Sequence, residues 1–165
     1  MTPKQLYEDK RMKWYAENRP NAVACNLVPA VKFPKVETAN GLTTFCKDIL
    51  NWDGHHAERT NNMGVARKKS HERFDIFTGK TYRVTTGVEY TKGGGTNGSS
   101  DIKGHFVSPN HKFPIPIYIE VKAGKDRVSD DQKEYEEKVT STGALHCYVR
   151  KPEDFVAFYN YLCTL

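Results

Sequence analysis

Two acidic residues and a lysine lie in two neighbouring segments whose apolar and polar residues alternate. Asp101 opens the segment Asp-Ile-Lys-Gly-His-Phe, and Glu120 and Lys122 close the segment Pro-Ile-Tyr-Ile-Glu-Val-Lys. Alternation with period two predicts half-buried strands. If these strands pair as a hairpin, both carboxylates and the amine meet at one end of a sheet. Hard divalent cations bind such oxygens, and a bound cation can promote hydrolysis of a phosphodiester.

The spacing of the two segments predicts which residues face each other. In an antiparallel pair, residues equidistant from the turn are partners. The midpoint between Asp101 and Glu120 falls between Asn110 and His111, inside the turn-forming segment Ser-Pro-Asn-His-Lys. We therefore expect the two carboxylates to lie opposite each other. Three apolar residues then take the buried face of the second strand: Ile117, Ile119 and Val121.

These residue types suggest a role for each group. Asp101 and Glu120 would bind Mg²⁺ or Mn²⁺, and the backbone carbonyl of Val121 is a candidate third ligand. Lys122 would orient the attacking water or stabilise developing negative charge. The alternative is a solvated face of an edge strand, because a bare Glu-x-Lys pattern arises often by chance.

The remaining chain predicts a mixed sheet flanked by helices. We expect helices over residues 3–18, from Thr38 to about 53, over 129–141 and over 152–162, and strands over 55–60, 101–106, 116–122 and 145–149. Proline-rich residues 20–37 are expected to be an extended arm or an irregular wrap, and 81–85 and 88–90 short strands. Residues 61–80 are expected to be a polar, basic excursion, with a short helix or an added hairpin as the two forms it could take. The last strand follows a helical crossover, so it should run parallel to a central strand. We expect one globular domain, in which residues 1–37 pack on a domain formed by 38–165.

A cluster of basic residues suggests a polyanionic partner. The net charge is +5, and seven Lys or Arg residues between Arg59 and Arg83 stand against two acids. Candidate phosphate contacts are Arg67, Lys68, Lys69, Arg73 and Lys92. A solvated loop is the alternative for such a charge run.

The composition is that of a globular protein in a reducing compartment. No run of about 18 apolar residues exists, and the first residues lack the apolar segment of a signal peptide, so no membrane partner is expected. The four cysteines are scattered without a Cys-x-x-Cys pair. We expect an intracellular location, such as the cytoplasm of a bacterium or of a phage-infected host.

Three motifs together resemble the PD-(D/E)XK nuclease superfamily, and within it the virus-type replication-repair nuclease (VRR-NUC) domain. The motifs are Gly98-Ser99-Ser100-Asp101, Ile119-Glu120-Val121-Lys122 and the downstream Gln132, and the similarity spans roughly residues 42–148. The resemblance implies a restriction-endonuclease-like αβββαβ core, here with an added helix at each end. It also implies divalent-metal-dependent cutting of DNA, often branched or flapped, with Asp101 and Glu120 binding the metal and Lys122 acting in catalysis.

Some residues depart from the family pattern or have a second interpretation. The proline of the superfamily name is Ser100, and the first core helix carries Asp48 instead of a glutamate. Gln132 fits a capping box with Ser129, whereas the resemblance places it at the active site.

The expected function is a metal-dependent DNA endonuclease acting in replication, repair or recombination, with duplex or structured DNA as its partner and a homodimer as one possible assembly. The alternatives are a non-catalytic nucleic-acid-binding module that keeps the fold, and a structural or inhibitory protein.

Overall fold

The computed structural model describes residues 1–60, 65–91 and 96–165. The chain divides into two compact units, the first formed by Met1–Thr60 and Asn97–Leu165 and the second by Asn61–Thr96. No boundary was expected from the sequence at either end of the second unit.

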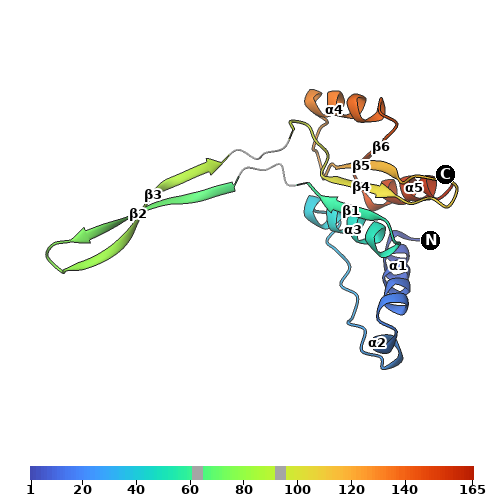
Figure 1. Ribbon diagram of the computed structural model, residues 1–165, viewed down its shortest axis with the longest axis horizontal. Coiled ribbons are helices and arrows are strands. Elements are labelled where there is room, and N and C mark those ends of the chain that lie inside the picture. The colour runs from blue at the N-terminus through green and yellow to red at the C-terminus, as the bar shows by residue number, and fades with distance from the viewer. Residues whose placement is uncertain (61–64, 92–95) are drawn as a thin grey trace. The chain divides into compact units, whose positions relative to one another are not determined.

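The first unit contains a four-stranded mixed sheet and five helices (Figure 1). Its elements are α1 (Pro3–Asn18), α2 (Pro20–Ala24), α3 (Ala39–Trp52), β1 (His56–Arg59), β4 (Ile102–Phe106), β5 (Ile115–Val121), α4 (Asp130–Thr140), β6 (Leu145–Val149) and α5 (Pro152–Leu162). The run from α3 to β6 has the expected αβββαβ order, with helices added at both ends. The strand order is β1-β4-β5-β6, and β6 runs parallel to β5, which confirms the predicted crossover.

The pairing of β4 with β5 has the register that the turn predicted. Ile102 is the partner of Ile119, and Lys103 is the partner of Tyr118. The same alternation continues through both strands, because Ile102, Ile117 and Ile119 are fully buried. Continued by one residue, this register places Asp101 opposite Glu120.

Helices cover the two faces of the sheet unequally. The apolar face packs against α3, α1 and α5 in one core, with these large residues fully buried: Leu42, Phe45, Ile49, Leu50, Phe155 and Leu162. Helix α4 lies on the opposite face (Figure 1), where Tyr135 contacts Tyr118 with ring centroids 6.0 Å apart. Thr38 begins α3 by accepting a hydrogen bond from the Gly41 amide at 3.1 Å, as expected of an N-cap.

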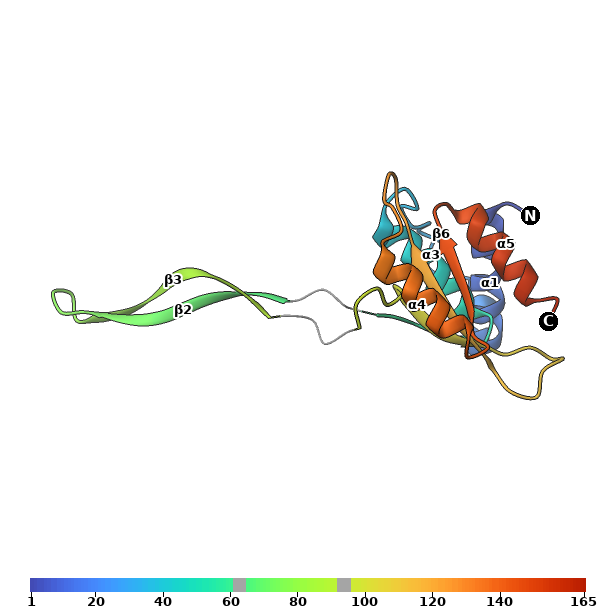
Figure 2. The same ribbon diagram turned by 90° about the horizontal axis from the view of Figure 1, so that it is seen from above.

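Two segments differ from the sequence-based expectations. The proline-rich arm contains the short helix α2, because Pro20 stands at its first position, where the fixed φ of proline suits a helix. For residues 61–80 an added hairpin was one of two alternatives, followed by two short strands. The second unit is a single long antiparallel hairpin of β2 (Val65–Asp75) and β3 (Lys80–Thr91), whose twisted ribbon is seen in Figure 2. Both faces of this hairpin are largely polar, so its strands lack the alternation that identifies half-buried strands.

Asp53, at the C-terminal end of α3, joins three helices of the first unit. Its carboxylate accepts a hydrogen bond from Lys10 of α1 at 2.6 Å and one from the Tyr159 hydroxyl of α5. His55 Nε2 lies 3.4 Å from the same carboxylate. Burial alone would raise the pKa of Asp53, but the contacts with His55, Lys10 and Tyr159 outweigh burial and hold the pKa well below its usual range.

None of the helices in the described parts of the chain has the length and apolar character needed to cross a lipid bilayer.

We predict that Asp53→Asn lowers the free energy of unfolding by about 2 to 4 kcal/mol at neutral pH. A carboxyl group whose pKa is depressed by folding stabilises the protein above its ordinary pKa, and this stabilisation is lost as the pH falls. The difference between wild type and variant should therefore shrink in acid, as urea unfolding at pH 7 and pH 3 would measure. Asp9→Asn, at an exposed position of α1, is the control. Equal stability of wild type and Asp53→Asn at pH 7 would contradict the role of Asp53.

Candidate active site

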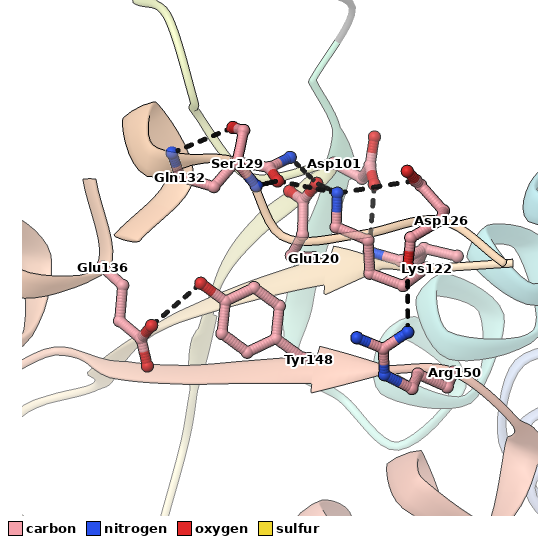
Figure 3. A network of polar contacts seen from close by, with 10 residues as sticks. Asp101, Glu120, Lys122, Asp126, Ser129, Gln132, Glu136, Tyr148 and Arg150 are labelled. Carbon is pink, nitrogen blue, oxygen red and sulfur yellow. Dashed lines mark hydrogen bonds and ion pairs between the residues drawn. The ribbon is translucent and has the colours of Figure 1, made fainter. Parts of the chain in front are cut away.

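Asp101 is fixed between two strands at the edge where β4 begins. Its backbone carbonyl accepts a hydrogen bond from the Thr60 amide at 2.7 Å, just after β1 ends. Its carboxylate oxygen Oδ2 accepts one from the Val121 amide of β5 at 2.9 Å. These two contacts turn the Asp101 side chain toward β5, where Glu120 lies (Figure 3). The structure therefore brings together the two carboxylates that the sequence analysis paired.

Lys122 is buried beside Glu120, directly after β5. Its side chain is only 3% exposed, and its amide donates to the Val149 carbonyl of β6 at 2.9 Å. Its amine Nζ lies 2.7 Å from Gln132 Oε1 and 3.2 Å from Glu120 Oε1 (Figure 3). A further carboxylate, Asp126 Oδ2, lies 3.5 Å from the same amine. The amine is thus held by three oxygen atoms, one of which belongs to a predicted metal ligand.

Gln132 belongs both to a helix cap and to this cluster. Its backbone amide donates to Ser129 Oγ at 3.3 Å, and its side-chain oxygen accepts from the Ser129 amide at 3.0 Å, which completes the predicted capping box. The same oxygen accepts from Lys122, while the amide nitrogen Nε2 donates to Glu120 Oε1. The two interpretations of Gln132 are therefore compatible, because one oxygen can accept two hydrogen bonds.

Helix α4 is anchored so that its first turn meets the end of β5. Beyond the contact of Tyr135 with Tyr118, the Tyr148 hydroxyl of β6 donates to Glu136 Oε2 at 2.8 Å. Gly98 approaches the same turn with φ +72°, and a Cβ atom there would lie 2.2 Å from the Asp131 carbonyl oxygen. Only glycine fits both the left-handed conformation and the close approach. The Gly-Ser-Ser-Asp segment thus packs directly against the helix that carries Gln132.

The electrostatics of the cluster favour a bound cation. Burial, together with the nearby Asp101 carboxylate, raises the pKa of Glu120 to about 7, because the opposing effect of Lys122 is smaller. The two carboxylates carry more negative charge than the single Lys122 amine can balance. A divalent cation would stabilise such a pair of carboxylates. Lys122 supplies one positive charge, and a divalent ion would supply the remainder.

The donor set fits a hard cation that keeps part of its water shell. Within residues 1–60, 65–91 and 96–165, no three Asp, Glu, His or Cys side chains are grouped as metal ligands. Two carboxylates are available, and the Val121 carbonyl faces the same strand edge as the Val121 amide that binds Asp101. Mg²⁺ commonly binds with one or two carboxylates and several waters, so two carboxylates and a carbonyl suffice.

The acid expected on the first core helix has another partner. Asp48 of α3 accepts a hydrogen bond from the Tyr7 hydroxyl at 3.0 Å, and Lys47 lies 3.1 Å from its carboxylate. These contacts make Asp48 part of the packing between α1 and α3, since Tyr7 belongs to the core. They give Asp48 a structural role.

The predicted phosphate-contacting residues belong to the second unit or lie outside the description. Lys68, Lys69 and Arg73 are exposed on β2. Arg67 also lies on β2, but its side chain and the whole of Lys92 fall outside the described residues. The structure therefore gives no geometry that joins these cations to Asp101 and Glu120.

Sequence reasoning missed three residues that support the site. Asp126 and Arg150 are linked through a hydrogen bond from Arg150 Nη1 to the Asp126 carbonyl at 3.0 Å (Figure 3). No sequence signal identifies them, because Asp126 lies in a loop whose path is set by tertiary contacts. Glu136 could have been found, because it lies four residues after Gln132 and so on the same face of α4.

We predict that metal-free wild type loses stability relative to Glu120→Gln as the pH rises from about 4.5 to about 7. A carboxyl group whose pKa is raised by folding keeps its proton in the folded state while the same group ionises in the unfolded state. The free energy of unfolding therefore falls as the pH rises from the unfolded pKa to the folded pKa. Chemical unfolding in EDTA across this range should show a relative loss on the order of 3 kcal/mol. Glu153→Gln, at an exposed position of α5, should show no such trend. Parallel pH profiles for wild type and Glu120→Gln would contradict the burial argument.

We predict that Ser129→Ala loosens Gln132 as well as the start of α4. Loss of the cap should lower the free energy of unfolding by about 1 kcal/mol. Hydrogen exchange of the Gln132 side-chain amide, followed by NMR, should become faster, because the Gln132 backbone loses the Ser129 hydroxyl that holds this residue in place. Ser129→Asp, which keeps a capping oxygen, should restore both values. Unchanged exchange of the Gln132 side-chain amide in Ser129→Ala would show that the cap does not hold this side chain in the cluster.

Comparison with known families agrees with this geometry. The family model of the VRR-NUC domain matches residues 36–151, which is more than half of the chain and includes Asp101, Glu120, Lys122 and Gln132. Neither the curated proteins nor the solved structures gave a match. The chain belongs to the VRR-NUC family of nuclease domains.

Proposed function

We propose that this chain is a divalent-metal-dependent endonuclease that hydrolyses phosphodiester bonds in DNA. The observation that carries the proposal is the buried cluster in which Glu120, Lys122 and Gln132 are mutually bonded beside Asp101. A solvated sheet face would leave such groups exposed, whereas Glu120 and Lys122 are 5% and 3% exposed. Burying an amine with carboxylates is costly, so this burial supports a functional cluster.

Each side chain has a task in the proposed reaction. Asp101 and Glu120, with the Val121 carbonyl, would hold Mg²⁺ or Mn²⁺, which would supply charge neutralisation at the phosphate and a lowered pKa for a water molecule. Lys122 is a donor whose amine lies 3.2 Å from Glu120 Oε1, where it can orient the attacking water or stabilise the pentavalent phosphorus oxyanion. Gln132 acts as a positioning residue, because it bonds both Lys122 and Glu120 and so fixes the distance between them.

The proposed substrate is DNA with a flap, a branch or another structural distortion. Support comes from membership of the VRR-NUC family and from the exposed cations of β2, which suit a polyanion. Action in replication, repair or recombination and assembly as a homodimer are part of the same proposal.

We predict that Lys122→Ala reduces cleavage at least about 100-fold, because it removes a positioned donor from the reacting centre. Cleavage of labelled duplex, single-stranded, flapped and four-way-junction DNA should be measured with Mg²⁺, with Mn²⁺ and with EDTA. Wild type should cut one or more of these DNAs with either metal and none in EDTA. Binding of uncut DNA to Lys122→Ala, followed by fluorescence anisotropy, should stay within about twofold of wild type.

The matched control is Lys125→Ala, which removes an exposed amine three residues away. This variant should cut at the wild-type rate. Metal-dependent cutting that survives in Lys122→Ala would remove the assignment of this residue. Wild-type protein that binds DNA but never cuts it would instead favour the non-catalytic binding module.

A further inference from the structure

The β2–β3 hairpin is a second unit that lacks a core of its own. Eleven residue pairs connect its strands, with a register shift between Lys69 and Ser70. Among its described side chains from 68 to 89, only Asp75 and Val84 are partly buried, and the others are exposed. An isolated two-stranded hairpin is marginally stable in water. A hairpin of this length therefore suits a surface that binds a partner.

The tip of the hairpin presents two apolar side chains on a preorganised turn. Phe77 is 100% exposed and Ile76 is 85% exposed. Asp75 fixes the turn beneath them, because its carboxylate accepts hydrogen bonds from the Phe77 amide at 2.9 Å and from the Thr78 hydroxyl at 2.7 Å. Gly79 closes the turn with φ +65°, and its amide donates a hydrogen bond to the Asp75 carbonyl at 2.8 Å. The hydrogen bonds that hold the turn do not use the side chains of Ile76 and Phe77. These two side chains are therefore available to contact another molecule.

One face of the ribbon carries three cations, which indicate the chemistry of the partner. Residues paired across an antiparallel ladder share a face, so Arg73 with Tyr82 and Asp75 with Lys80 lie on one side. Lys69 lies on the same side by the period of two. Glu89, the partner of Arg67, is an exposed acid on the same face. Because Asp75 is occupied in the turn, this face presents three cations, one free acid and an aromatic ring, Tyr82, which is 47% exposed. This face complements a polyanion and repels a second copy of itself.

The opposite face carries a similar charge. There Glu72 is paired with Arg83, so one positive and one negative charge stand side by side. Phe74 with Thr81 and Ser70 with Thr85 continue this face without charge. Lys68 is its remaining described cation. Over both faces, five described cations stand against three acids, so the ribbon has a net positive charge that suits a phosphate backbone.

We propose that the β2–β3 hairpin is a DNA-binding ribbon whose tip residues, Phe77 and Ile76, insert at a distorted base step. Lys69, Arg73 and Lys80 would contact phosphates, and Phe77 would stack on or wedge beside an unstacked base. A two-stranded ribbon fits a DNA groove, and apolar wedges in DNA-binding proteins commonly enter where stacking is already weak. The inference rests on the proposed DNA substrate and narrows it to DNA that contains an unpaired or unstacked base.

The test uses the full chain in EDTA, so that binding is measured without cutting. The probe is a 30-base-pair duplex with one bulged nucleotide beside 2-aminopurine, and a fully paired duplex of the same sequence is its control. Fluorescence anisotropy gives the affinity, and 2-aminopurine fluorescence reports unstacking. Phe77→Ala should weaken binding to the bulged duplex about tenfold or more and abolish the fluorescence change, because a base stacked on an aromatic side chain contributes strongly to binding. Phe77→Trp should restore both.

Two further sets of variants separate the contribution of the tip from that of the cations along the ribbon. The double substitution Lys69→Ala with Arg73→Ala should weaken binding to both duplexes similarly and reduce the dependence of log affinity on log salt by about one to two. Val88→Ala removes an exposed apolar side chain of β3 away from the tip. This control should bind like wild type.

Several results would overturn the inference. Phe77→Ala with wild-type affinity and an unchanged 2-aminopurine signal would do so directly. Binding of wild type, but not of Phe77→Ala, to anionic phosphatidylserine vesicles with no effect on DNA would assign the tip to a membrane surface. Phe77-dependent dimerisation in sedimentation, again with no effect on DNA, would assign it to a second copy of the chain.

The failure of this inference can be distinguished from failure of the proposed function. If wild type and Phe77→Ala cut DNA equally with Mg²⁺ and bind the bulged duplex equally, the endonuclease proposal stands and the role of Phe77 is refuted. If Phe77 affects affinity and 2-aminopurine fluorescence as expected but no metal supports cutting, the endonuclease proposal is refuted and the role of Phe77 stands.

Discussion

The antiparallel pairing of β4 with β5 is the constraint on which the candidate active site depends. Buried isoleucines fix this register from the apolar face of the sheet, since Ile102 faces Ile119 in the core. A slip of one residue would turn every side chain of one strand to the other face, so it would bury polar residues and separate Asp101 from Glu120. The energy that holds the two carboxylates together therefore comes largely from hydrophobic packing on the far side of the sheet.

Helix α4 adds the second half of the arrangement. It brings Gln132 over the end of β5, where one amide group bonds both Lys122 and Glu120. The helix is held there by its cap at Ser129, by the close approach of Gly98 and by the bond between Glu136 and Tyr148. These contacts lock the rotamers of side chains that would otherwise move apart into solvent. Such preorganisation is what hydrolytic sites need.

Much of the first unit could be predicted from the sequence because its strands obey simple rules. Alternating apolar residues and a single turn candidate fixed the β4–β5 register, and the residues flanking α4 predicted its cap. Other features required tertiary information. The β2–β3 hairpin has polar residues on both faces and a register shift, so its alternation carries no signal of burial. The Arg150 guanidinium donates a hydrogen bond to the backbone carbonyl of Asp126, which lies in a loop. No periodic pattern in the sequence predicts such a contact.

We propose that Asp101 and Glu120 bind one cation together. Anomalous X-ray diffraction from crystals of the full chain grown with Mn²⁺ would locate that cation. We expect one strong anomalous peak within about 2.0 to 2.3 Å of an oxygen from each carboxylate. The Asp101→Asn variant should lose most of this peak at the same Mn²⁺ concentration. A crystal in which Mn²⁺ is absent from this position, or contacts only one of the two carboxylates, would contradict the claim.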